Sequence, residues 1–189
     1  QSEIIYLVLI MIATAIPAGF AAGLFGIGGG LVTVPILFYI FSFSGVETAY
    51  VMHLAVGTSF GIIIPTSTVS VLTHHQHKAV DFSIVKGFGF FVAIGVILGT
   101  IFAASLATKP LILFFTIIVY VLAFYLLFLK EKETNIEIKI GFFSKAISGI
   151  VSGFISAPMG IGGAVMNVPI LKFFGYPINK AIGSAAAIG

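Results

Sequence analysis

The chain has 189 residues, of which 59% are hydrophobic and only 8% are charged, and its mean hydropathy is +1.22. A soluble domain usually carries about 25% charged residues, so this composition excludes a water-soluble globular protein and requires a surface that faces lipid. The formal net charge is +3, all basic residues are lysines, and both Arg and Cys are absent. These absences exclude an arginine clamp for an oxyanion, disulfides and thiolate metal sites.

The first hydrophobic stretch, Ile4–Val46, carries no charge and is far longer than the roughly 20 residues that one membrane crossing needs. No basic residue precedes it, unlike a signal peptide. Its glycine run at residues 26–30, followed by Pro35, marks where a helix must break. We therefore expect Ile4–Leu24 to cross the membrane, residues 26–30 to be unwound, and Leu31–Phe41 to form a half-helix.

Later hydrophobic runs predict single crossings, and the lysines between them predict orientation. If each run crosses once, the loops His74–Lys78 and Lys130–Lys145 lie on one side together with Lys86. That side then holds six lysines, against three on the other (Lys109, Lys172 and Lys180). The positive-inside rule predicts that the lysine-rich loops are cytoplasmic in a multi-pass protein of the cell membrane.

The most specific signal in the sequence is an internal duplication. The segment Gly26–Leu37 recurs as Gly160–Leu171 at an offset of 134, with eight of twelve positions identical. Ala55–Thr58 likewise resembles Ala181–Ser184. The chain thus divides into a first transmembrane repeat (residues 1–130), a loop (131–145) and the start of a second repeat (146–189).

The second repeat is shorter than the first and stops within a hydrophobic segment. A helix cut there leaves carbonyl groups unpaired in lipid. We therefore expect the sequence to be part of a protein of about 260 residues. The repeats are parallel if the glycine segments are re-entrant, and inverted if Leu31–Phe41 crosses completely. Transporters use both arrangements.

Duplicated, glycine-interrupted hydrophobic segments indicate a transporter's binding site. The half-helix after each break would present free N–H groups and the positive end of its dipole, which attract an anion without arginine. Neutral side chains nearby can add hydrogen bonds. The alternative interpretation is close helix packing, because small residues are common at helix contacts in membranes. The predicted substrate-binding residues are Gly28, Gly29, Gly30, Thr33, Pro35, Thr58, Ser59, Gly162, Gly163, Asn167, Pro169 and Ser184.

Four histidines are candidates for proton or metal chemistry. His53 is the ionisable residue well inside a predicted span, which makes it a candidate for proton coupling, with a hydrogen-bonded structural histidine as the alternative. His74, His75 and His77 form a single cluster without acidic partners, which favours a solvated loop over a metal site. The glycine run also fails both nucleotide-binding patterns. We therefore predict no metal and no cofactor.

At these residues the chain resembles the TauE/SafE family of sulfite exporters. The resemblance rests on Gly23–Pro35, on its second copy at Gly160–Pro169 and on Ala55–Ser59. It implies an all-α transmembrane permease that moves small sulfur-containing anions such as sulfite, sulfonates or thiosulfate. The implied partners are such an anion and the lipid bilayer, and no nucleic acid. The sequence also allows a homo-oligomer. The copies differ where Ser156–Met159 replaces Ala22–Phe25, so the two half-sites are expected to play unequal roles.

Two other classes of function compete with a transporter. A membrane-embedded serine hydrolase would use Ser59 or Ser184 with His53 as its base, although no known nucleophile motif is present. A structural membrane subunit would use the glycines for packing alone.

Overall fold

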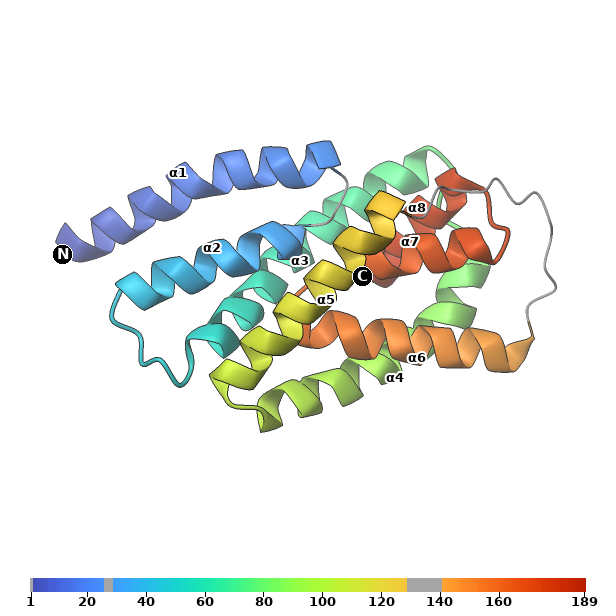
Figure 1. The fold of residues 1–189 in the computed structure, drawn as a ribbon. Helices are drawn as coiled ribbons and strands as arrows, with labels where there is room; N and C mark the ends of the chain where they lie inside the picture. Colours follow the sequence, from blue (N-terminus) through green and yellow to red (C-terminus); the bar gives the residue numbers. More distant parts are fainter. Residues whose placement is uncertain (1, 26–28, 129–140) are drawn as a thin grey trace.

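The computed structural model describes residues 2–25, 29–128 and 141–189, and in these ranges the chain is all-α with no strand, as predicted (Figure 1). Four of the described helices (α3 to α6) are long and apolar enough to cross a membrane. The helices are α1 (Ser2–Phe25), α2 (Gly29–Phe43), α3 (Val51–Gln76), α4 (Phe82–Ser105), α5 (Thr108–Phe128), α6 (Phe142–Met159), α7 (Ala164–Phe173) and α8 (Ile178–Ile188).

Local chemistry explains two of the helix boundaries. Asp81 precedes α4 with extended backbone, and its side chain accepts a hydrogen bond from the Ser83 N–H at 3.0 Å, which caps the helix. Gly160 ends α6 with φ of 60°, a left-handed conformation that glycine adopts without steric cost. Its N–H and that of the next residue donate to carbonyl groups in the last turn of α6. The glycine therefore stops the helix inside a hydrophobic segment.

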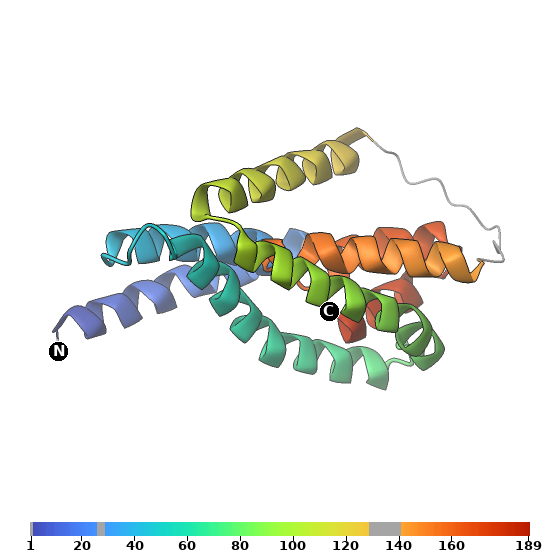
Figure 2. The same cartoon turned by 90° about the horizontal axis from the view of Figure 1, so that it is seen from below.

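Both half-helices turn back toward the end from which the preceding helix came. Figures 1 and 2 show that α2 returns toward the N-terminal end of α1, and that α7 returns toward the start of α6. Helices α1 and α6 run in opposite directions in both views. Both glycine segments are thus re-entrant. The repeats are nevertheless inverted rather than parallel, because α3, α4 and α5 make an odd number of crossings between the α1–α2 hairpin and the α6–α7 hairpin.

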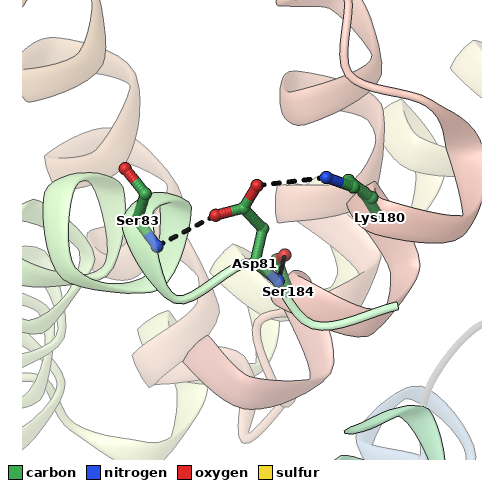
Figure 3. Close-up of polar contacts among 4 residues, drawn as sticks. All are labelled: Asp81, Ser83, Lys180 and Ser184. Carbon is green, nitrogen blue, oxygen red and sulfur yellow. Dashed lines mark hydrogen bonds and ion pairs between the residues drawn. The ribbon is translucent and has the colours of Figure 1, made fainter. Parts of the chain in front are cut away.

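Hydrogen bonds identify which loops share an end of the bundle. At one end, the hydroxyl of Thr108, at the start of α5, donates to the carbonyl of Ala49, just before α3. At the other end, Lys180 at the start of α8 pairs with Asp81 at 3.5 Å (Figure 3). The predicted location of Lys180 on the side opposite the α3–α4 loop is therefore wrong. The same correction applies to Lys172, in the last turn of α7, because α7 and α8 form one hairpin.

Helices α4 and α6 make the closest pairing of the bundle, and glycine permits it. A Cβ at Gly153 would overlap the carbonyl of Val92, and a Cβ at Gly95 would overlap the carbonyl of Ile150. Small residues let membrane helices approach in this way. This pairing joins the first repeat to the start of the second.

The boundaries predicted for the first break and for the loop agree with the helices only in part. Gly29 and Gly30 are helical, as the first residues of α2, and residues 26–28 lie outside the described ranges. The predicted half-helix Leu31–Phe41 lies within α2. Helix α6 begins at Phe142, inside the predicted loop 131–145, of which residues 131–140 are not described.

Candidate functional site

The two glycine segments meet in the interior of the bundle. A Cβ at Gly30 would overlap the carbonyl oxygen of Gly160 and lie against the Cα of Ile161. The start of α2 therefore rests directly on the backbone of the second break. Because Gly30 has no side chain, the two backbones touch at this point, as in the packing interpretation of the glycines.

Hydrogen bonds from two hydroxyl groups connect the first copy of the duplicated segment to the second glycine break. Ser59, fully buried on α3, donates to the Gly160 carbonyl at 2.8 Å. Thr33 on α2 lies 3.0 Å from the Ser59 hydroxyl and 3.0 Å from the carbonyl of Gly29. Each hydroxyl has one hydrogen to donate, and acceptors within the protein engage both. This cluster therefore stabilises the contact between the breaks and keeps no hydroxyl hydrogen for a ligand.

A second polar cluster belongs entirely to the second copy. Ser152 and Ser156 lie one turn apart on α6, and Asn167 lies on α7; all three are buried. The Ser152 hydroxyl donates to Asn167 Oδ1 at 2.6 Å. Asn167 Nδ2 and Ser156 Oγ are buried without a hydrogen-bond partner. Buried polar groups are nearly always paired, so these two atoms need an explanation.

Two cavities lie at the start of α7. The first cavity, of about 530 Å³, is lined by Gly29, Thr33 and Gly162, together with the hydroxyl-bearing face of α3 at Thr66 and Ser67. The second cavity, of about 380 Å³, is lined by residues of α3, α4, α6 and α8 and by Gly163. None of the described residues that line either cavity has a charged side chain. The residues around the second cavity are Phe60, Val92, Ala93, Val96, Ile97, Ser156, Ala157, Ile161, Gly163, Ile188 and Gly189.

The structure brings together five of the predicted site residues in the glycine segments. Gly29, Gly30, Thr33 and Ser59 lie at the first break, and Gly162 lies beside them in the first cavity. Gly28 lies outside the described ranges.

Gly163 and Asn167 lie together at the second break. Gly163 is the N-cap residue of α7, and a Cβ there would overlap Asn167 Nδ2. The side-chain amide therefore folds back over the first turn of its own helix.

Other predicted residues lie away from both breaks or take a different role. Ser184 accepts a hydrogen bond from the Asp81 N–H at 3.0 Å and so anchors α8 to the start of α4 (Figure 3). Thr58 is half-buried beside Ser59. Pro35 lies inside α2, and Pro169, inside α7, lines an apolar groove between α5, α6 and α7.

His53 lies in the first turn of α3, near the end that holds Thr108. Its Nε2–H donates to the Ala103 carbonyl at 3.2 Å, because a carbonyl can only accept, and its Nδ1 is buried without a partner. The ring joins the start of α3 to the end of α4. His75 packs edge-on against the ring of Phe82, and His77 ends α3.

Sequence reasoning missed Ser152 and Ser156. Neither is among the predicted site residues, and Ser156 enters only as part of the segment Ser156–Met159 in which the two copies differ. Their counterparts at the offset of 134 are Ala18 and Ala22. The gain of two hydroxyl groups in one copy of a duplicated helix was the signal that could have identified them.

Two oppositely directed helix breaks in contact, with cavities beside them, are typical of a membrane transporter with discontinuous helices. Residues 11–189 match the family described as "Sulfite exporter TauE/SafE", and the chain belongs to that family.

Relatives from distant organisms agree with this assignment. A "probable membrane transporter protein" of Haemophilus influenzae is 34% identical over 96% of this chain and 69% of its own length. A protein of the same description from Methanocaldococcus jannaschii is 29% identical over 100% of this chain and 70% of its own length. A third, from Bacillus subtilis, is 25% identical over 95% of this chain and 73% of its own length. No solved structure matches the chain.

Proposed function

We propose that this protein is a secondary transporter that moves small sulfur-containing anions, such as sulfite, thiosulfate or sulfonates, across the cell membrane. The observation that carries the proposal is the meeting of two inverted glycine breaks beside uncharged cavities, in a chain of the TauE/SafE family. The first cavity and the second cavity adjoin at the start of α7, where Gly162 lines one, Gly163 lines the other and Gly189 lines both. An anion passing this helix end would move from one cavity to the other.

The electrostatics of the interior favour binding by fixed dipoles. A bare oxyanion in hydrocarbon is very costly unless protein groups replace its water. The chain has no Arg, and the described lysines lie at or near helix ends rather than at the cavities. Helix N-termini supply N–H donors and about half a positive charge each. Such sites bind anions without a permanent charge that would hinder release.

The geometry disfavours the serine hydrolase alternative. Ser59 donates its hydrogen to the Gly160 carbonyl, and the Ser184 hydroxyl accepts from a backbone N–H. The ring of His53 is bonded to the Ala103 carbonyl. A catalytic serine needs a base within hydrogen-bond reach of its hydroxyl, and His53 makes no such bond with either serine.

We propose that the end of the bundle that holds Asp81 and Lys180 is cytoplasmic. Five described lysines lie toward this end (Lys78, Lys86, Lys145, Lys172 and Lys180), and Lys109 lies at the other. Lysine enrichment of this kind is typical of the cytoplasmic side.

Flux measurements test the proposed function directly. Purified protein in liposomes is expected to take up radiolabelled sulfite or thiosulfate, with competition from unlabelled sulfite and sulfonates and little competition from chloride. Empty liposomes give the background. Uptake at the background rate for every sulfur anion, from a preparation that is folded, would contradict the proposal.

A further inference from the structure

We propose that the second copy alone recognises the oxyanion: Asn167 Nδ2 and Ser156 Oγ donate hydrogen bonds to it, and Ser152 is a positioning residue for the Asn167 amide. This inference rests on the proposed function and specifies which groups perform it. The ligand is an oxyanion with several terminal oxygens, because the site offers hydrogen-bond donors.

The orientation of the Asn167 amide is the first step of the argument. Its Oδ1 is occupied by the hydroxyl of Ser152 at 2.6 Å, and its Nδ2 carries two hydrogens with no acceptor in the protein. Asn167 is completely buried. An amide held in this way has its acceptor occupied and its two donor hydrogens unsatisfied. A ligand that supplies acceptors is the partner that satisfies it.

The second step is that several hydrogen-bond donors lie near the start of α7. Asn167 Nδ2 lies against Gly163, the N-cap residue of α7, and Gly163 lines the second cavity. Ser156, 2% exposed and also without a partner, lines the same cavity. The first turn of α7 has N–H groups without an intrahelical acceptor. Ser156 and the start of α7 thus place donors at the second cavity, and Asn167 Nδ2 adjoins Gly163, which lines that cavity.

The third step is the contrast with the first copy. At the offset of 134, the three polar positions Ser152, Ser156 and Asn167 correspond to Ala18, Ala22 and Thr33. Two of the three counterparts have no polar side-chain atom, and the hydroxyl of Thr33 is engaged with Gly29 and Ser59. The first copy therefore supports the backbone contact, while the second copy keeps its donors for a ligand.

The apolar remainder of the second cavity limits what can bind. Val92, Val96 and Ile97 on α4 line the wall beside the donors. The cavity volume of about 380 Å³ exceeds that of a small inorganic oxyanion. It accommodates an oxyanion head at the donors and a short apolar substituent against α4.

Sulfite is the probe for the test, with uptake into liposomes measured over a range of concentrations. Asn167→Asp keeps the size of the side chain but replaces the donor with a negative charge, and we expect loss of uptake. Loss of one hydrogen bond to a charged group costs about tenfold in affinity or more, so Ser156→Ala should raise the half-saturating concentration about tenfold.

The test of Ser152 must distinguish a role in positioning the Asn167 amide from a role in helix packing. Ser152→Ala frees the amide to rotate, which should raise the half-saturating concentration about threefold to tenfold with little change in the maximal rate. Ser152→Thr retains the hydroxyl and should restore the wild-type value. Ser148→Ala is the matched control, since Ser148 lies one turn earlier on α6 and donates to the Ser144 carbonyl. Thr33→Ala, the first-copy counterpart of the Asn167 change, should shift the half-saturating concentration less than about threefold.

The outcomes separate the inference from the proposed function. If the wild type transports sulfite, and Asn167→Asp and Ser156→Ala transport it with the wild-type half-saturating concentration, the inference is wrong while the function stands. If the wild type binds sulfite in a thermal-shift titration but does not transport it, the proposed function is wrong. The affinity of the same variants for sulfite in that titration then tests the proposed site. If the wild type neither binds nor transports sulfite, both are overturned.

Discussion

At the scale of single residues, glycine has two distinct uses in this protein, and the space around each glycine separates them. Gly30 and Gly153 lie where any Cβ would overlap a carbonyl group of another helix. Gly29 differs, because a Cβ there would meet no atom within 4 Å and the residue lines the first cavity. The first kind of glycine is needed for packing, and the second borders open space in the first cavity.

This distinction predicts the effect of filling the first cavity. Gly29→Leu adds a side chain to open space, so we expect the folded protein to keep its thermal stability while sulfite flux falls about tenfold or more. The control is Gly57→Leu on the exposed side of α3, where a Cβ also meets nothing within 4 Å. Equal flux in the two variants would show that the first cavity is not on the transport path.

At the scale of helices, the α4–α6 pairing should dominate the stability of the bundle. Gly153→Leu forces a large side chain against the Val92 carbonyl, and overpacking of this kind costs about 1–3 kcal/mol or more. We expect a clear loss in the free energy of unfolding in detergent. Gly87→Leu on α4 is the control, because a Cβ there meets nothing within 4 Å and the residue is exposed. Similar losses for both variants would contradict the assignment of this contact as the main joint.

The link between α8 and the start of α4 provides a second prediction at this scale. Asp81 both caps α4 and pairs with Lys180, which is half exposed (Figure 3). Loss of an N-cap costs about 1 kcal/mol, whereas an exposed ion pair contributes roughly 0–1 kcal/mol. Asp81→Ala should therefore lower the free energy of unfolding more than Lys180→Ala does. A larger effect for Lys180→Ala would mean that the ion pair, rather than the cap, holds this junction.

At the scale of the whole molecule, the fold predicts which loops share a side of the membrane. The absence of cysteine allows single cysteines to be introduced at exposed positions in the loops or in the helix turns beside them. An impermeant thiol reagent added outside intact cells should label Thr48→Cys and should label His77→Cys and Asn179→Cys only after permeabilisation. Labelling of His77→Cys and Asn179→Cys from opposite sides would contradict the inverted arrangement. Labelling of both from outside, with Thr48→Cys protected, would reverse the orientation.

The sequence predicted the elements of this fold better than their directions. The duplication, the broken helices and the half-helix after each break follow from glycine, proline and hydrophobic length, which act locally. The side of the membrane on which Lys180 lies, and whether the repeats are parallel or inverted, depend on where a short helix such as α2 ends. A helix of 15 residues can return or continue without any change in its composition.

The candidate site was predictable to a similar extent. The glycines were predicted because they recur at a fixed offset, and Asn167 was predicted as the counterpart of Thr33. Ser184 was selected because its segment resembles Ala55–Thr58, yet its hydroxyl bonds to the Asp81 backbone. Contacts between distant segments decided that outcome, and a single sequence does not specify them.

The central claim is that an oxyanion binds in the membrane interior, to neutral donors at the helix breaks. A crystal structure with selenite, an analogue of sulfite whose selenium scatters anomalously, tests it most directly. The predicted result is one anomalous peak in the second cavity, between Ser156 and the first turn of α7, within hydrogen-bond distance of Asn167 Nδ2. A peak beside Lys78 or Lys180 at the end of the bundle, with none in the interior, would contradict the claim.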